Sequence, residues 1–143
     1  MKSTAKIIIT EQAIPSQKNG SWSQRLEYFL KSDHNVIDYF ICGETNQSLA
    51  TTTTFYREKQ VQSKWRLKLF PNTRYQHYTN RLEQLVSQHS HAVVCVVDNV
   101  KLMLAVSECI EKKNLKNKVT LLFYCCGHSY LLDDNLQKKF LKH

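Results

Sequence analysis

The sequence has little glycine: three residues in a chain of 143. None of them lies in a G-x-G-x-x-G motif or in the glycine-rich loop of a P-loop, the short patterns with which many α/β domains hold the phosphates of a nucleotide. Dinucleotide binding of the common kind is therefore disfavoured. Gly20 and Ser21 stand at the start of a predicted helix, where free backbone N–H groups and the helix dipole can hold a phosphate or a carboxylate. A turn at Gly20 and a helix cap at Ser21 explain the same pair equally well.

Long apolar runs are absent as well. The three isoleucines at 7–9 are too few for the core of a signal peptide, and no run approaches the roughly 18 apolar residues that cross a bilayer. Hydrophobic residues make up 42% of the chain and charged residues 22%, as in an ordinary globular protein. We expect a cytoplasmic protein whose contact with the inner face of the membrane is at most peripheral.

Cysteine pairs of the C-x-x-C type are also lacking, and the number of cysteines is odd. A secreted disulfide framework is therefore disfavoured, and a reducing compartment is expected. Adjacent residues of a strand point to opposite faces, so Cys125 and Cys126 cannot easily share one zinc ion, and no second ligand pair has suitable spacing. We expect no metal site. These two thiols are either inert and buried or, with His128 as a nearby base, candidates for a nucleophile.

Acidic residues are few: 12 against 20 lysines and arginines, which gives a formal net charge of +8. Such a charge favours anionic partners, namely lipid headgroups, phosphorylated ligands or nucleic acid. Within a basic stretch from 56 to 75, cations and apolar residues alternate most densely at Lys64, Trp65, Arg66 and Lys68. This pattern is typical of a surface that lies on an anionic membrane, and equally of a solvated helix with a buried apolar stripe. No nucleic-acid motif accompanies it, so nucleic acid is disfavoured as a partner.

What the sequence does contain is a repeated switch between short apolar runs and helical spacing. Short runs rich in β-branched residues predict buried strands at 5–10, 36–42, near Phe55, 91–99 and 118–126. Apolar residues at helical spacing predict helices at 20–33, 75–86, 100–113 and from 136 to the end. This alternation indicates one α/β domain over residues 1–143, with a Rossmann-like, open and mainly parallel sheet and helices on both faces.

The predicted fold directs attention to one edge of the sheet. Ligands of open parallel sheets bind outside the carboxyl ends of the strands, near the point where the strand order reverses. We expect Asp98 and His128 to end neighbouring strands at this edge, Asp98 as a candidate general base and His128 as a substrate contact. Both have plainer explanations. Asp98 and Asn99 suit the N-cap of the following helix, and His128 suits a loop histidine bonded to backbone.

The order of four segments resembles the N-terminal half of bacterial glycosyltransferases with the two-domain GT-B architecture, of the kind grouped as family 4. These segments are IIITEQAIPSQKNGSWSQRLEYFL, VIDYFICGE, VVCVVDNVKL and KVTLLFYCCGHSY, and the similarity covers nearly the whole chain. The resemblance implies that this domain binds the acceptor, a glycan or a lipid-linked molecule. It further implies that a C-terminal domain binds the nucleotide-sugar and that sugar transfer takes place in the cleft between the two.

The resemblance also implies roles for single residues. Gly20 and Ser21 match the glycine-containing loop that faces the donor phosphates. Asp98 matches a polar residue that ends the fourth strand, and His128 matches the histidine that approaches the transferred sugar. Neighbouring residues expected to contact substrate are Asn99, Gly127 and Ser129. The basic segment around Trp65 matches the surface with which these enzymes approach a membrane or an anionic acceptor.

Two features depart from the family pattern. The first loop has one glycine where many relatives have two, and the chain stops at His143, before any donor domain. We therefore expect the chain to be inactive alone and to need no cofactor, with a nucleotide-sugar donor binding only together with the missing C-terminal domain. Two other readings stay open: a stand-alone, non-catalytic α/β module that holds an anionic partner, and a thiol enzyme centred on Cys126.

Overall fold

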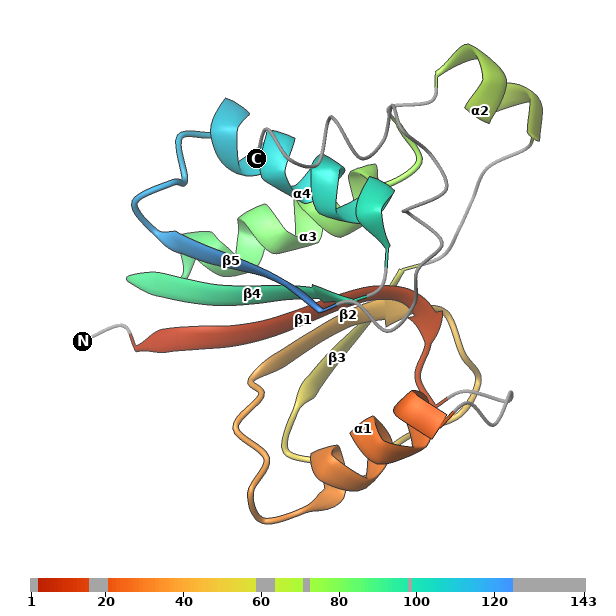
Figure 1. The fold of residues 1–143 in the computed structure, drawn as a ribbon, viewed down its shortest axis with the longest axis vertical. Coiled ribbons are helices and arrows are strands. Elements are labelled where there is room, and N and C mark those ends of the chain that lie inside the picture. Colours follow the sequence, from red (N-terminus) through yellow and green to blue (C-terminus); the bar gives the residue numbers. More distant parts are fainter. Residues whose placement is uncertain (1–2, 16–20, 59–63, 71–72, 98, 125–143) are drawn as a thin grey trace.

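The computed structural model describes residues 3–15, 21–58, 64–70, 73–97 and 99–124, apart from the side chains of residues 21 and 22. Within these ranges strands and helices alternate along most of the chain (Figure 1). Their bounds are β1 Thr4–Ala13, α1 Ser21–Lys31, β2 Tyr39–Gly43, β3 Thr54–Glu58, α2 Lys64–Leu69, α3 Gln76–Ser87, β4 His91–Val97, α4 Val100–Lys112 and β5 Val119–Tyr124. The helix predicted from 136 onward lies outside the described residues.

The five strands form one parallel sheet in the order β3-β2-β1-β4-β5. The chain runs outward from β1 through β2 to β3, returns to the other side of β1 as β4, and continues outward to β5. The strand order therefore reverses between β1 and β4. This arrangement confirms the predicted α/β class and the Rossmann-like sheet.

Helices cover both faces of the sheet, as predicted. Figure 1 shows α3 and α4 on one face and α1 on the other. The larger core contains alternate residues of β1 and β4. It also contains the apolar residues that stand at helical spacing in the predicted helix at 75–86, namely Tyr75, Tyr78, Leu82, Leu85 and Val86. The smaller core lies under α1 and contains Ile14, Leu30, Phe40 and Cys42. The central strand β1 contributes Ile7 and Ile9 to the larger core and Ile8 to the smaller one, which explains its unbroken apolar run.

Two strand boundaries differ from prediction by three residues. β1 continues to Ala13 instead of ending at residue 10, and β2 begins at Tyr39 instead of 36. The extension of β1 contains a bulge, because Ile9 pairs with Ile41 but Ala13 pairs with Gly43, so β1 has more residues than β2 over this length. A Cβ atom at Gly43 would lie 2.5 Å from the carbonyl oxygen of Glu11, so only glycine lets the bulge approach this closely.

The late start of β2 follows from the contacts of Asn35. Its amide nitrogen donates to the carbonyl of Leu30 at 3.1 Å and to the hydroxyls of Thr51 and Thr53 at 3.1 and 2.8 Å, while its amide oxygen accepts from the backbone N–H of Ile37 at 3.0 Å. Asn35 thereby joins the end of α1 to the threonine run before β3. The segment between β2 and β3 contains no helix or strand, and these contacts fix its return to the sheet.

Among the described residues no helix could cross a membrane; the longest, α4, has 13 residues.

Replacing Asn35 tests this account of how the segment between β2 and β3 is held. We expect Asn35→Ala to lower the free energy of unfolding by about 1–3 kcal/mol, because it leaves partly buried polar groups without partners. The matched control is Asn80→Ala on the exposed side of α3, which we expect to change stability by less than about 0.5 kcal/mol. Urea unfolding followed by circular dichroism measures both, and equal effects of the two substitutions would contradict the assigned role of Asn35.

Candidate functional site

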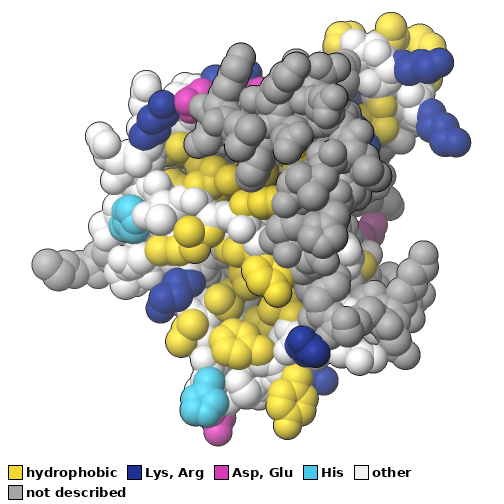
Figure 2. Space-filling view, viewed as in Figure 1, with side chains coloured by type: hydrophobic (Ala, Val, Ile, Leu, Met, Phe, Trp, Pro, Cys, Tyr) yellow, Lys and Arg dark blue, Asp and Glu magenta, His cyan; other side chains and the backbone are white. Residues whose placement is uncertain are grey.

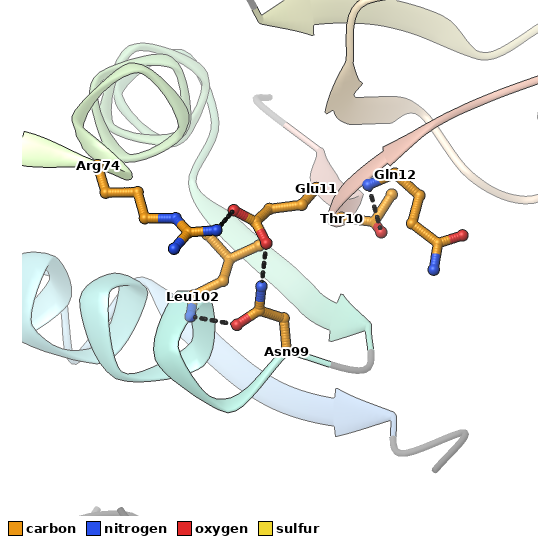
Figure 3. Close-up of polar contacts among 6 residues, drawn as sticks. All are labelled: Thr10, Glu11, Gln12, Arg74, Asn99 and Leu102. Carbon is orange, nitrogen blue, oxygen red and sulfur yellow. Dashed lines mark hydrogen bonds and ion pairs between the residues drawn. The ribbon is translucent and has the colours of Figure 1, made fainter. Parts of the chain in front are cut away.

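Polar side chains from three parts of the chain meet at the carboxyl edge of the sheet, where the strand order reverses. Glu11 comes from the bulged end of β1, Arg74 from the segment before α3, and Asn99 from the start of α4 (Figure 3). In parallel α/β sheets this is the position at which ligands bind. We call Glu11, Arg74 and Asn99 the switch-point cluster.

Glu11 is the centre of the switch-point cluster. One of its carboxylate oxygens lies 3.4 Å from the guanidinium of Arg74, and the other accepts a short hydrogen bond from the Asn99 amide (Figure 3). The carboxylate is largely buried, while Arg74 is about half exposed and also lies over the ring of Tyr75, at 5.3 Å. The cluster thus presents a cation to solvent and holds a carboxylate beneath it.

Asn99 was predicted both as a helix cap and as a substrate contact. The cap is confirmed: Asn99 has an extended backbone, and its side-chain oxygen accepts from the N–H of Leu102 at 3.0 Å. Because the oxygen is held this way, the amide nitrogen is turned toward Glu11. The cap therefore orients Asn99 within the cluster, and its contact with substrate stays a prediction.

Sequence reasoning did not single out Glu11 or Arg74. Glu11 was assigned to a loop because the predicted strand ended at residue 10, and Arg74 was counted with the basic stretch. Alternation through Ile7, Ile9 and Glu11 was a usable signal, since residues two apart in a strand share a face. The bulge, in which the hydroxyl of Thr10 accepts from the N–H of Gln12 at 3.2 Å, had no sequence signal of its own (Figure 3).

Two tyrosines lie close to the switch-point cluster: Tyr75, which directly precedes α3, and Tyr78 in the first turn of α3. The Tyr75 hydroxyl lies near Asn99 and Glu11, and burial, with the Glu11 charge adding to it, raises the pKa of Tyr75. Tyr78 is 2% exposed, and its hydroxyl has no hydrogen-bond partner among the residues that the structure describes. Burial and the nearby charges of Glu11 and Glu58 raise the pKa of Tyr78 as well. Both phenols therefore remain protonated at neutral pH.

A second carboxylate–arginine pair lies at the end of β3. Glu58 bonds to Arg81 of α3 at 3.0 Å, and Arg81 also lies 4.6 Å from the ring centre of Tyr56. Together with Glu11 and Arg74, this gives the edge two carboxylates that can accept from hydroxyl groups and two arginines that can donate to oxygen. In the part of the chain that the structure describes, no cluster of three His, Cys, Asp or Glu residues could hold a metal ion.

Several predicted site residues lie outside the described residues: Gly20, Asp98, Gly127, His128 and Ser129. Ser21 begins α1, but its side chain is not described, so its role as a cap or ligand stays a prediction. The strands that precede these two residues in the sequence, β4 before Asp98 and β5 before His128, pair with each other as predicted, while the positions of Asp98 and His128 stay predictions.

The four residues of the predicted membrane surface, Lys64, Trp65, Arg66 and Lys68, lie together on α2 and are exposed. The alternative reading of that segment as a helix with a buried apolar stripe is wrong, because α2 has no buried residue. The helix is short and stands away from the layer formed by α3 and α4 (Figure 1).

The thiols of the described residues are protonated ones. Burial raises the pKa of Cys42 from its ordinary value near 9 to about 11, and burial also raises the pKa of Cys95 and Cys109. A raised pKa removes the thiolate that acts as nucleophile. Cys125 and Cys126 lie outside the described residues, so the thiol-enzyme reading is not tested by these three.

Comparisons of the chain with protein-family models, with curated proteins and with solved structures found no match. The resemblance to family 4 glycosyltransferases therefore stays a prediction from sequence, while the α/β fold with its parallel sheet is established by the structure.

The two tyrosines offer a matched pair of substitutions. We expect Tyr78→Phe to leave the free energy of unfolding unchanged or to raise it by up to about 1 kcal/mol, because it removes a buried hydroxyl that no described residue hydrogen-bonds. Tyr75→Phe should lower it by about 1 kcal/mol, since the contacts to Asn99 and Glu11 are lost. Denaturant unfolding at neutral pH measures both free energies. Equal destabilisation by Tyr78→Phe and Tyr75→Phe would show that the two hydroxyls do not differ in their polar contacts.

Cys42 makes stability depend on alkaline pH. Its folded pKa is about 11 against an ordinary value near 9, so between these pH values the unfolded thiol ionises while the folded one keeps its proton. The stabilising contribution is complete below pH 9 and is lost by about 11, a fall of about 2–3 kcal/mol. We expect the difference in unfolding free energy between wild type and Cys42→Ala to shrink over this range, and a difference independent of pH would contradict the buried, protonated thiol.

Proposed function

We propose that this chain is the acceptor-side domain of a glycosyltransferase that moves a sugar from a nucleotide-sugar to a glycan or lipid-linked acceptor. The observation that carries the proposal is the switch-point cluster: Glu11, Arg74 and Asn99 come from separate elements and meet at the ligand-binding edge of a Rossmann-like sheet. The order of the segments that resembles family 4 enzymes gives the proposal its reaction class.

The chemistry of the edge suits a ligand with many hydroxyl groups. Glu11 and Glu58 accept hydrogen bonds, and Arg74 and Arg81 donate them, so a sugar ring could be held by alternating acceptors and donors. Arg74 is the most open of the three cluster residues to solvent and would also receive a phosphate of a lipid-linked acceptor. In this proposal Asp98 and His128 stand beside the transferred sugar, and a donor domain supplies the nucleotide-sugar.

A second candidate is a non-catalytic module that holds an anionic partner through charge alone. It is favoured by the net charge of +8 and by the exposed lysines of α2. The two candidates differ in what they require of the switch-point cluster. A charge-driven module binds through many exposed cations, whereas an acceptor site depends on the buried carboxylate of Glu11.

The proposal is tested by amide chemical-shift mapping with neutral disaccharides and with the same sugars linked to a polyisoprenyl diphosphate. We expect shifts at the carboxyl ends of β1, β3 and β4. Glu11→Gln and Arg74→Gln should each weaken binding by about tenfold or more, as expected for hydrogen bonds to charged groups.

The matched control is the double variant Glu83→Gln, Lys113→Gln, which removes an ion pair of 3.2 Å between α3 and the end of α4, away from the cluster. It should bind as the wild type does. Binding that is insensitive to Glu11→Gln and is lost as salt increases would reject the acceptor site and favour the charge-driven module.

A further inference from the structure

Helix α2 exposes apolar side chains that a globular protein ordinarily buries. Trp65 is 73% exposed, Leu69 54% and Phe70, which directly follows the helix, 57%. Figure 2 shows hydrophobic side chains gathered at this projecting part of the molecule, at the upper right, with lysine or arginine side chains next to them. Contiguous exposed apolar surface of this kind marks a site of interaction.

The spacing of residues within α2 places the apolar and the cationic side chains on two neighbouring strips of the helix surface. Trp65 and Leu69 are four residues apart and so form one ridge, and Lys64 and Lys68 form a parallel ridge beside it. Leu67 is the least exposed residue of the segment. The helix therefore turns an apolar ridge outward with a cationic ridge at its flank.

We infer that α2 is a membrane-docking element that inserts Trp65, Leu69 and Phe70 at the surface of an anionic bilayer while Lys64 and Lys68 contact lipid phosphates. Tryptophan favours the interface between headgroups and acyl chains, and lysine stems can pack along apolar surface while the ammonium group stays with the phosphates. A helix of six residues inserts too little apolar surface to bind alone, so the attraction of the anionic bilayer surface for Lys64 and Lys68 supplies the remainder.

Docking through α2 would bring the ligand-binding edge to the membrane. The carbonyl of Phe70 accepts from the hydroxyl of Thr73 at 2.7 Å and from its N–H at 3.1 Å, and the next residue, Arg74, is paired with Glu11. The contacts between Phe70 and Thr73 thus link the end of the docking element to the residue before Arg74 of the switch-point cluster. The inference does not depend on the reaction proposed for the chain, because it concerns the partner of α2 and not the ligand of the cluster.

The test is sedimentation of the full chain with vesicles of phosphatidylcholine alone or with added phosphatidylglycerol. We expect binding only when phosphatidylglycerol is present, and weaker binding as salt increases. Lys64→Gln with Lys68→Gln should weaken partitioning by about 20- to 30-fold, from about fivefold per lysine at an anionic surface. Trp65→Ser with Leu69→Ser should weaken it as strongly, and brominated acyl chains should quench tryptophan fluorescence in wild type but not in Trp65→Phe.

Matched controls separate local docking from overall charge. Lys101→Gln with Lys118→Gln removes the same charge from exposed positions on α4 and before β5, and Tyr28→Ser removes an aromatic side chain that is 82% exposed on α1. Both controls should bind vesicles within about twofold of wild type if charge far from the bilayer is screened. Equal losses in controls and α2 variants, or equal binding to neutral vesicles, would overturn the inference. Binding to single-stranded nucleic acid but not to vesicles, lost in the same α2 variants, would assign α2 to nucleic acid instead.

Discussion

The pairing of β1 with two neighbours is the interaction on which the rest of this structure depends. β2 bonds to one edge of β1 and β4 to the other, and helices cover both faces, so the strand has no side that meets water along its middle. This explains the run of three isoleucines, and it also locates the candidate site. Because the chain leaves β1 in one direction and returns on its other side, the carboxyl end of β1 lies where the strand order reverses, and polar side chains from both halves meet there.

Gly43 allows the geometry of the candidate site at the carboxyl end of β1. The bulge of β1 needs the space that a Cβ atom at Gly43 would fill, and the bulge brings Glu11 under Arg74 and beside Asn99. Two of these partners are in turn fixed by local structure, Asn99 as the cap of α4 and Arg74 by its contact with the ring of Tyr75. Side chains held in this way lose little freedom when a ligand binds, which is the physical advantage of building a site on strands and helix ends.

The fold could be predicted from sequence because its elements are defined by local periodicity. All five apolar residues at helical spacing in the predicted helix at 75–86 are buried, and the strands rich in valine and isoleucine form the predicted parallel sheet. The site could be predicted only where a local rule applied, as for Asn99, which suits a helix cap. Glu11 was missed because the bulge depends on Gly43, far along the chain, and no local pattern reports such a contact. The exposure of α2 could not be predicted for a similar reason. Its spacing of apolar and basic residues fits both a helix packed against the core and a helix exposed to solvent.

The arrangement of β1 also determines the order in which the chain can become stable. The partner of Thr4 is His91, and that of Ile9 is Val96, so the central strand emerges from the ribosome long before one of its two neighbours exists. Until β4 is made, β1 can pair only with β2, and the apolar surface of its larger core still lacks the residues of β4 and α4. Contacts this distant in sequence slow folding, and they leave the isoleucines of β1 open to chaperones or to other unfinished chains. The central strand of the finished domain therefore gains its second neighbour only late in synthesis.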